Sequence, residues 1–213
     1  RLPYRIVDRR IGNTSRVVDT FMKILSLPDG RFTSSAVMGI LQCPEVLRRF
    51  SLSGEDFDII GGWVRDTAVY WGIDAEHKGS LALPEIFENT WRFGLERMLL
   101  GSVMACQDAA PLGILPYMEI EGGNMQVLGR FITYFRLLSE TYYKLRGEHS
   151  PDAWGILING IIEGFFEPDP ASSEELLQVT AAAARLREME TLSGFSSSVG
   201  LPPVKEFIEQ RLS

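Results

Sequence analysis

The chain has 213 residues, of which 45% are hydrophobic and 23% are charged, and its net charge is −7. This composition is ordinary for a globular protein with a sizeable core, so it excludes wholesale disorder, and the acidic balance argues against a general binder of polyanions. Two cysteines and two histidines are too few for a disulfide framework or a zinc cluster, and we expect reduced thiols and a cytoplasmic location.

The first part of the chain predicts one short strand followed by helices. Residues 2–8 alternate and are rich in Ile, Val and Tyr, which is typical of a strand. Residues 16–27 place apolar side chains at helical spacing after Ser15, a candidate N-cap. Further helices are expected over 35–43 after Thr33 or Ser34, over 44–50 with Pro44 in its first position, and from Ser53 through Val64.

Longer helices with two loops are expected in the remainder. Residues 70–88 contain Gly and Pro and are expected to form a long loop, as are residues 106–123. Helices are expected over 90–104, 124–145, 151–166 and 172–192, and from 202 to the end. The total of eight or nine helices and at most one strand predicts a mainly α fold, a multi-helix orthogonal or bundle-like domain. No apolar run approaches the roughly 20 residues of a membrane span.

The stretch "NTWRFGLERMLLG" (89–101) combines aromatic residues with arginine. Such a pattern occurs in platforms that stack nucleic-acid bases and in helices anchored in a core. Its helical spacing favours the second interpretation, a structural core stripe on one helical face. The stripe consists of Trp91, Leu95, Met98 and Leu99.

The sequence contains none of the motifs that grip a nucleotide or activate a nucleophile. Neither G-x-x-x-x-G-K-[ST] nor G-x-S-x-G occurs, and the acids at Glu119/Glu121 and Glu174/Glu175 have no histidine near them in sequence. We therefore predict no catalytic, cofactor-binding or metal-binding residue. A carboxylate-dependent enzyme built around the loops 70–88 or 106–123 stays open as an alternative.

The N-terminal residues carry a local excess of positive charge. Arg1, Arg5, Arg9, Arg10 and Arg16 are accompanied by a single acid in an otherwise acidic chain. Because guanidinium groups pair with phosphate, contact with a DNA backbone is a candidate role for Arg5, Arg9 and Arg10. A solvated face and an interface with another protein segment are the alternatives. If these arginines share a surface with exposed aromatic residues, the chain could be a stand-alone module that binds single-stranded DNA.

A series of phrases resembles known proteins. "LPYRIVDRR" and "VVDTFMKILSLPDGRF" resemble the entry into the helical insertion (2B) subdomain of UvrD-like helicases. With "RFTSSAVMGILQCPEVLRRFSLS", "WVRDTAVYWGID", "NTWRFGLERMLLGSVM", "GILPYMEIEG" and "GFFEPD", the succession is similar to the RecC family, the gamma subunits of exodeoxyribonuclease V, over nearly the whole chain. Active helicases continue P-Y-R with Gly-Gly and Phe, whereas "IVDRRIGNTS" follows here, which fits an inactive subunit better.

The resemblance implies a role in DNA repair and recombination. RecC-type subunits are built like a helicase and nuclease with decayed active sites. They hold RecB-type and RecD-type motors together, guide DNA, and recognise the Chi sequence. For this chain the resemblance implies a non-catalytic structural and interaction module, with DNA met through the parent complex and no role for a membrane. The chain is then one helical domain over 1–213, with 1–10 a strand remnant of the flanking motor-like domain and 15–213 the insertion, excised from a longer polypeptide.

Overall fold

The computed structural model describes residues 15–103, 113–120, 122–170, 172–193 and 196–212. Within these ranges the chain is mainly helical and has no sheet, and two isolated β-bridges join Thr33 to Trp71 and His149 to Val199. The mainly α fold class is confirmed. The predicted strand at 1–10 lies outside the described residues.

Ten α-helices and one 3-10 helix are described. They are α1 (Arg16–Leu25), η1 (Leu27–Asp29), α2 (Ser34–Leu41), α3 (Pro44–Arg49), α4 (Gly54–Asp66), α5 (Ala75–Ser80), α6 (Trp91–Val103), α7 (Asn124–Leu145), α8 (Pro151–Phe165), α9 (Ser173–Ser193) and α10 (Leu201–Leu212). None of these helices combines the length and the apolar character that a bilayer span requires.

The helix starts follow the capping residues. The hydroxyls of Ser15, Thr33 and Ser150 each accept a hydrogen bond from a backbone N–H in the first turn. Ser53 forms a capping box with Asp56, in which each side chain accepts from the other residue's backbone N–H. Pro44 occupies the first turn of α3, where its missing N–H costs nothing. The starts predicted from Ser15, Thr33, Ser53 and Pro44 are confirmed, and α8 begins at Pro151 as expected.

The expectation of a continuous loop over 70–88 is wrong, because α5 lies inside it. Asp74 starts this helix by accepting a hydrogen bond from the His77 N–H at 2.8 Å. The helix has six residues and lacks an extended amphipathic pattern, so periodicity gave no signal for it. Its burial of His77 and Lys78 comes from tertiary packing instead.

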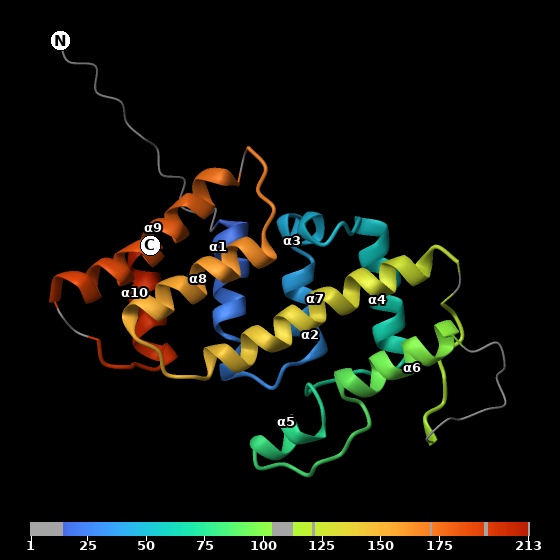
Figure 1. Ribbon diagram of the computed structural model, residues 1–213. Coiled ribbons are helices and arrows are strands. Elements are labelled where there is room, and N and C mark those ends of the chain that lie inside the picture. Colours follow the sequence, from blue (N-terminus) through green and yellow to red (C-terminus); the bar gives the residue numbers. More distant parts are fainter. Residues whose placement is uncertain (1–14, 104–112, 121, 171, 194–195, 213) are drawn as a thin grey trace.

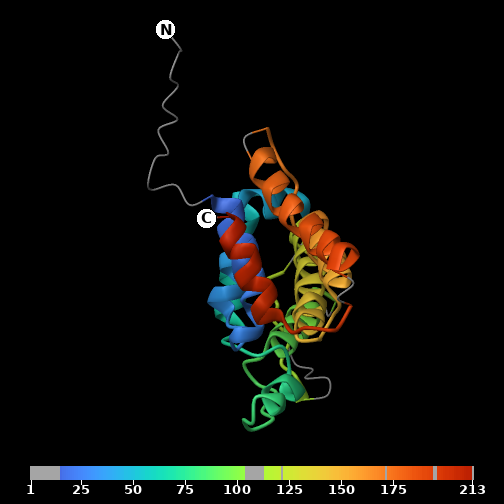
Figure 2. The same ribbon diagram turned by 90° about the vertical axis from the view of Figure 1, so that its left-hand side faces the viewer.

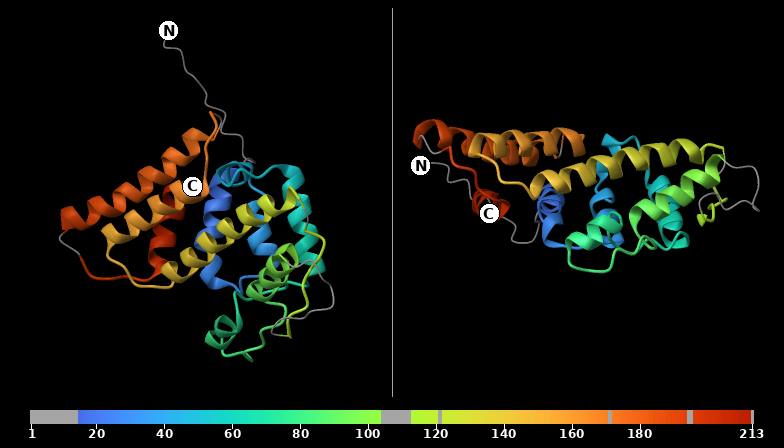
Figure 3. Two further views of the ribbon diagram at one scale, coloured as in Figure 1. Left: turned by 45° about the vertical axis from the view of Figure 1, so that its right-hand side comes forward. Right: turned by 60° about the horizontal axis from the view of Figure 1, so that its bottom comes forward.

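The helices form two layers that cross each other. α7, α8 and α9 lie in one layer, and α1, α2, α4 and α6 run beneath them (Figure 3, right). Figure 2 shows both layers edge-on, with α10 on the same side as α1. α1, α2 and α4 run across the direction of α7, whereas α8 and α9 are antiparallel neighbours (Figure 1). The described part of the chain is therefore an orthogonal arrangement with one helical hairpin at its end.

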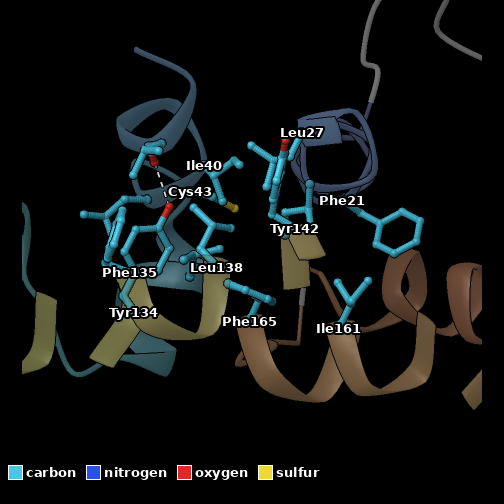
Figure 4. Packing of buried hydrophobic residues seen from close by; sticks show 14 of the residues in the cluster. Phe21, Leu27, Ile40, Cys43, Tyr134, Phe135, Leu138, Tyr142, Ile161 and Phe165 are labelled. Carbon is cyan, nitrogen blue, oxygen red and sulfur yellow. Dashed lines mark hydrogen bonds between the residues drawn. The ribbon is translucent and has the colours of Figure 1, made fainter. Parts of the chain in front are cut away.

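The core lies between these layers. Figure 4 shows Tyr134, Phe135 and Leu138 of α7 and Phe165 of α8 packed beneath residues of α1 and α2. Tyr134 is fully buried, and its hydroxyl donates to the Val37 carbonyl oxygen at 2.7 Å, so its polar atom is satisfied inside the core. The aromatic residues of α7 thus hold the first helices against the second layer.

Candidate functional site

The start of α6 is anchored in the core. Trp91 has no exposed surface, and its ring packs against Phe131 and Phe135 of α7 at centroid distances of 6.0 and 5.2 Å. Its indole N–H donates to the Phe32 carbonyl oxygen at 3.1 Å. A side chain held in this way has no free face for a base, so Trp91 does not form a stacking platform.

The remainder of the predicted stripe divides between core and surface. Leu95 and Met98 are buried beside Trp91. Leu99 is 43% exposed, so its assignment to the core is wrong. Trp91, Leu95 and Met98 already define the buried face through steps of four and three, and Leu99 falls about 100° further around the helix.

A buried histidine joins the 70–90 segment to α7. The Nδ1 of His77 accepts from the Ile73 N–H at 3.4 Å, and its Nε2 lies 2.9 Å from the Tyr142 hydroxyl. The neutral ring therefore carries its proton on Nε2 and donates it to Tyr142. The Arg146 guanidinium also donates to that hydroxyl, at 3.2 Å. Burial, together with the positive charge of Arg146, lowers the pKa of His77, although Asp74 opposes the shift.

We expect this histidine to make stability depend on pH. Because the pKa of His77 is lower in the folded chain than in the unfolded chain, the unfolded chain takes up more protons as the pH falls through about 6.5. The free energy of unfolding should then fall between pH 7.5 and 5.5, by at most about 1.4 kcal/mol per pH unit. Urea unfolding across this range measures it. His77→Gln should flatten the dependence and His149→Gln should keep it; an equally steep dependence in His77→Gln would contradict the assignment.

Trp71, which belongs to the same segment, lies beside two cations. The Lys78 ammonium is 4.7 Å from its ring centroid, and the Arg31 guanidinium is 5.8 Å away. Lys78 is itself buried and donates to the Glu88 carbonyl oxygen at 2.9 Å. The contacts made by Lys78 hold the 70–90 segment in place.

A second buried polar cluster centres on Glu45 at the start of α3. Its carboxylate is fully buried and accepts from Arg16 of α1 at 2.8 Å and from the Cys43 thiol at 3.0 Å. Arg48 bridges the same carboxylate to Asp169, at 3.4 and 3.1 Å. Burial raises the pKa of Glu45, but the hydrogen bonds from Arg16 and Cys43 outweigh it, so the pKa lies below its usual range. The cluster ties α1, α3 and the α8–α9 connection together.

The hydrogen bonds of these two buried polar clusters stabilise the fold. His77 is occupied by Tyr142 and Ile73, and Glu45 by Arg16 and Cys43. No group of three His, Cys, Asp or Glu side chains able to hold a metal ion is found among the described residues. The alternative enzyme would draw its catalytic acids from the 70–88 segment. Asp74 of this segment is engaged as the N-cap of α5.

Several predicted positions cannot be placed. Arg5, Arg9 and Arg10 lie outside the described residues, as does part of the loop 106–123. The polar clusters around His77 and Glu45 were missed by sequence reasoning. Tyr142 is 65 residues from His77, and Arg16 is 29 residues from Glu45, so local spacing does not signal these two contacts.

Known proteins match this sequence along its length. The family model of the RecBCD enzyme subunit RecC fourth domain matches residues 14–213. The RecBCD enzyme subunit RecC of Escherichia coli (strain K12) is 32% identical over 212 residues, which are 99% of this chain and 19% of that protein. The subunit of Mycolicibacterium smegmatis is 30% identical over 189 residues, 86% of this chain and 17% of that protein.

A more distant relative covers the same region. The RecBCD enzyme subunit RecC of Haemophilus influenzae is 22% identical over 212 residues, which are 100% of this chain and 18% of that protein. The chain thus spans about one fifth of the length of these curated relatives. Since the fourth-domain model runs through all the described helices, the chain belongs to the RecC family and corresponds to its fourth domain.

Proposed function

We propose that this chain is a non-catalytic structural and interaction module of a RecC-type subunit of the RecBCD helicase-nuclease, exodeoxyribonuclease V. The observation that carries the proposal is the match of the RecC fourth-domain model to residues 14–213. The module would support the processing of double-strand breaks and Chi-regulated recombinational repair. Its partners would be the RecB-type and RecD-type subunits, and its location the cytoplasm, where chromosomal DNA is processed.

The described polar groups support a role without chemistry of its own. A general base needs a lone pair that can reach a substrate, whereas both ring nitrogens of His77 are engaged in the core. A thiolate nucleophile needs a lowered pKa, whereas burial raises the pKa of the Cys43 thiol, and its hydrogen bond to Glu45 raises it further. Helicase and nuclease turnover would then belong to the partner subunits.

The mechanism we propose is mechanical. Crossing layers and a core rich in aromatic residues make a rigid body. A rigid body presents a surface of fixed shape to its partners, which a flexible linker does not. The module would correspond to the helical insertion (2B) subdomain of UvrD-like helicases, with 15–213 as the insertion and 1–10 as a strand of the neighbouring motor-like domain. It would meet DNA as part of the assembled complex.

The test compares complete RecC-type subunits with and without this module. We expect loss of the module to impair co-purification with the RecB-type and RecD-type subunits or to abolish the response to Chi. Unchanged assembly together with an unchanged Chi response would overturn the proposal. The isolated chain should show no ATPase or nuclease activity above that of a mock purification. ATPase or nuclease activity that co-purifies with the chain through every chromatographic step would instead favour the enzyme alternative.

A further inference from the structure

A surface hollow between α3, α7 and α8 gathers arginine side chains. Its volume is about 310 Å³. Its lining includes Arg49 at the end of α3 and Arg130 and Arg136 of α7, with the hydroxyls of Ser51 and Thr133 among them. We call this hollow the arginine groove. Glu140 is the one acidic residue in the lining, so the groove is basic on a chain whose net charge is −7.

Two of the three guanidinium groups are fixed by backbone carbonyls. Arg130 Nη1 donates to the backbone carbonyl oxygen of Ser51 at 2.8 Å, and Arg49 Nε donates to the backbone carbonyl oxygen of Glu163 at 3.0 Å. Each guanidinium has five N–H donors, so each keeps donors for a further partner. A group held in place beforehand loses less conformational entropy when it binds.

The charges of the arginine groove are not balanced by ion pairs, unlike those of five other basic residues. Arg16, Arg48, Arg92, Arg187 and Lys205 all pair with carboxylates. Among the described residues, Arg49, Arg130 and Arg136 form no such ion pair, and the exposed side chain of Arg136 makes no hydrogen bond. Three like charges around one hollow raise the local potential and favour an anion.

We propose that the arginine groove binds backbone phosphates of a DNA strand. The choice of phosphodiester rests on the proposed function, because a RecC-type subunit would work on DNA. Guanidinium groups bind phosphate oxygens through paired N–H donors, and the Ser51 hydroxyl can add a further hydrogen bond. The one aromatic side chain in the lining, Phe50, is only 8% exposed, so no base can stack on it. Binding is therefore independent of base sequence.

Fluorescence anisotropy with labelled oligothymidylate and the full 213-residue chain measures this binding. For three phosphate contacts the logarithm of affinity should fall with the logarithm of salt concentration with a slope of about −2. Arg136→Glu should weaken binding about tenfold or more and make the slope shallower by about 0.7. Arg136 is the informative position because its exposed side chain makes no described bond whose loss would disturb the fold.

Arg65→Glu is the matched control, since it makes the same charge change in another hollow, which Asp58 also lines. It should weaken binding less than about twofold. Equal losses in Arg136→Glu and Arg65→Glu would reduce the effect to net charge and overturn the groove. Absence of wild-type binding at low salt would do the same. Displacement of the oligonucleotide by polyglutamate as readily as by unlabelled DNA would point to an acidic protein partner and overturn the choice of DNA.

Photo-cross-linking in the assembled complex separates this proposal from the proposed function. A photoreactive amino acid at Thr133, which is exposed and lines the groove, should cross-link to labelled DNA. The same amino acid at Leu177 of α9, which is also exposed, should not. A complex that assembles without cross-linking at position 133 would overturn the arginine groove and leave the module's role intact. Failure of assembly after deletion of the module is the separate readout of that role.

Discussion

Trp91→Ala should remove about 3–5 kcal/mol from the free energy of unfolding. The substitution opens a cavity between α6 and α7, because the indole has no exposed surface and packs on Phe131 and Phe135. It also leaves the Phe32 carbonyl oxygen without its indole donor. For a chain of this length the melting temperature should fall by roughly 6–20 °C.

Leu99→Ala is the control for this measurement. It truncates an apolar side chain on the same helix, but Leu99 is 43% exposed, so the loss should stay below about 1 kcal/mol. Thermal unfolding followed by circular dichroism compares the two variants. Comparable losses in both would mean that Leu99 is packed as tightly as Trp91 and would contradict the burial described for α6.

Long amphipathic helices were the predictable part of the fold. α7 begins at Asn124 and ends at Leu145, as the recurring apolar residues predict, because one face of a long helix must meet the core. Ser53 and Pro44 marked helix starts for local reasons of capping and backbone geometry. Both kinds of signal lie within a few residues of the element that they define.

The unpredicted features depend on distant contacts. α5 is short and is held by the burial of His77 and Lys78, which the local sequence does not announce. Glu45 reads as an ordinary first-turn acid, yet Arg16 and Arg48 accompany it in a buried cluster. Leu99 matched the apolar spacing of α6, but only the position of α7 decides which edge of that stripe is covered.

The candidate sites divide in the same way. The sequence predicted DNA-backbone contacts at Arg5, Arg9 and Arg10, because these arginines are close together in the chain. The arginine groove is assembled from residues on α3 and α7 that are some eighty positions apart, as the bond from Arg130 to Ser51, across 79 residues, illustrates. Charge clusters in space need the fold before they can be recognised, and this one follows from the crossing of the two layers.

Gly101→Ala should destabilise the chain by about 2 kcal/mol or more, although alanine is the better helix former. A Cβ at position 101 would overlap the carbonyl group of Tyr117, a backbone contact that no rotamer change can relieve. The 115–117 segment is fixed on α6, since the Tyr117 N–H donates to the Arg97 oxygen and the Arg97 side chain donates to the Leu115 oxygen, both at 2.9 Å. The added methyl group must therefore break these bonds or displace α6.

Gly129→Ala tests the same chemical change where space is available. No atom outside the helix lies within 4 Å of a Cβ built at Gly129 in α7, so only the helix propensity changes there. We expect a gain of up to about 1 kcal/mol. Urea unfolding of both variants should thus give effects of opposite sign. A Gly101→Ala chain as stable as the wild type would mean that the 115–117 segment does not rest on α6, and the close approach at Gly101 would have to be abandoned.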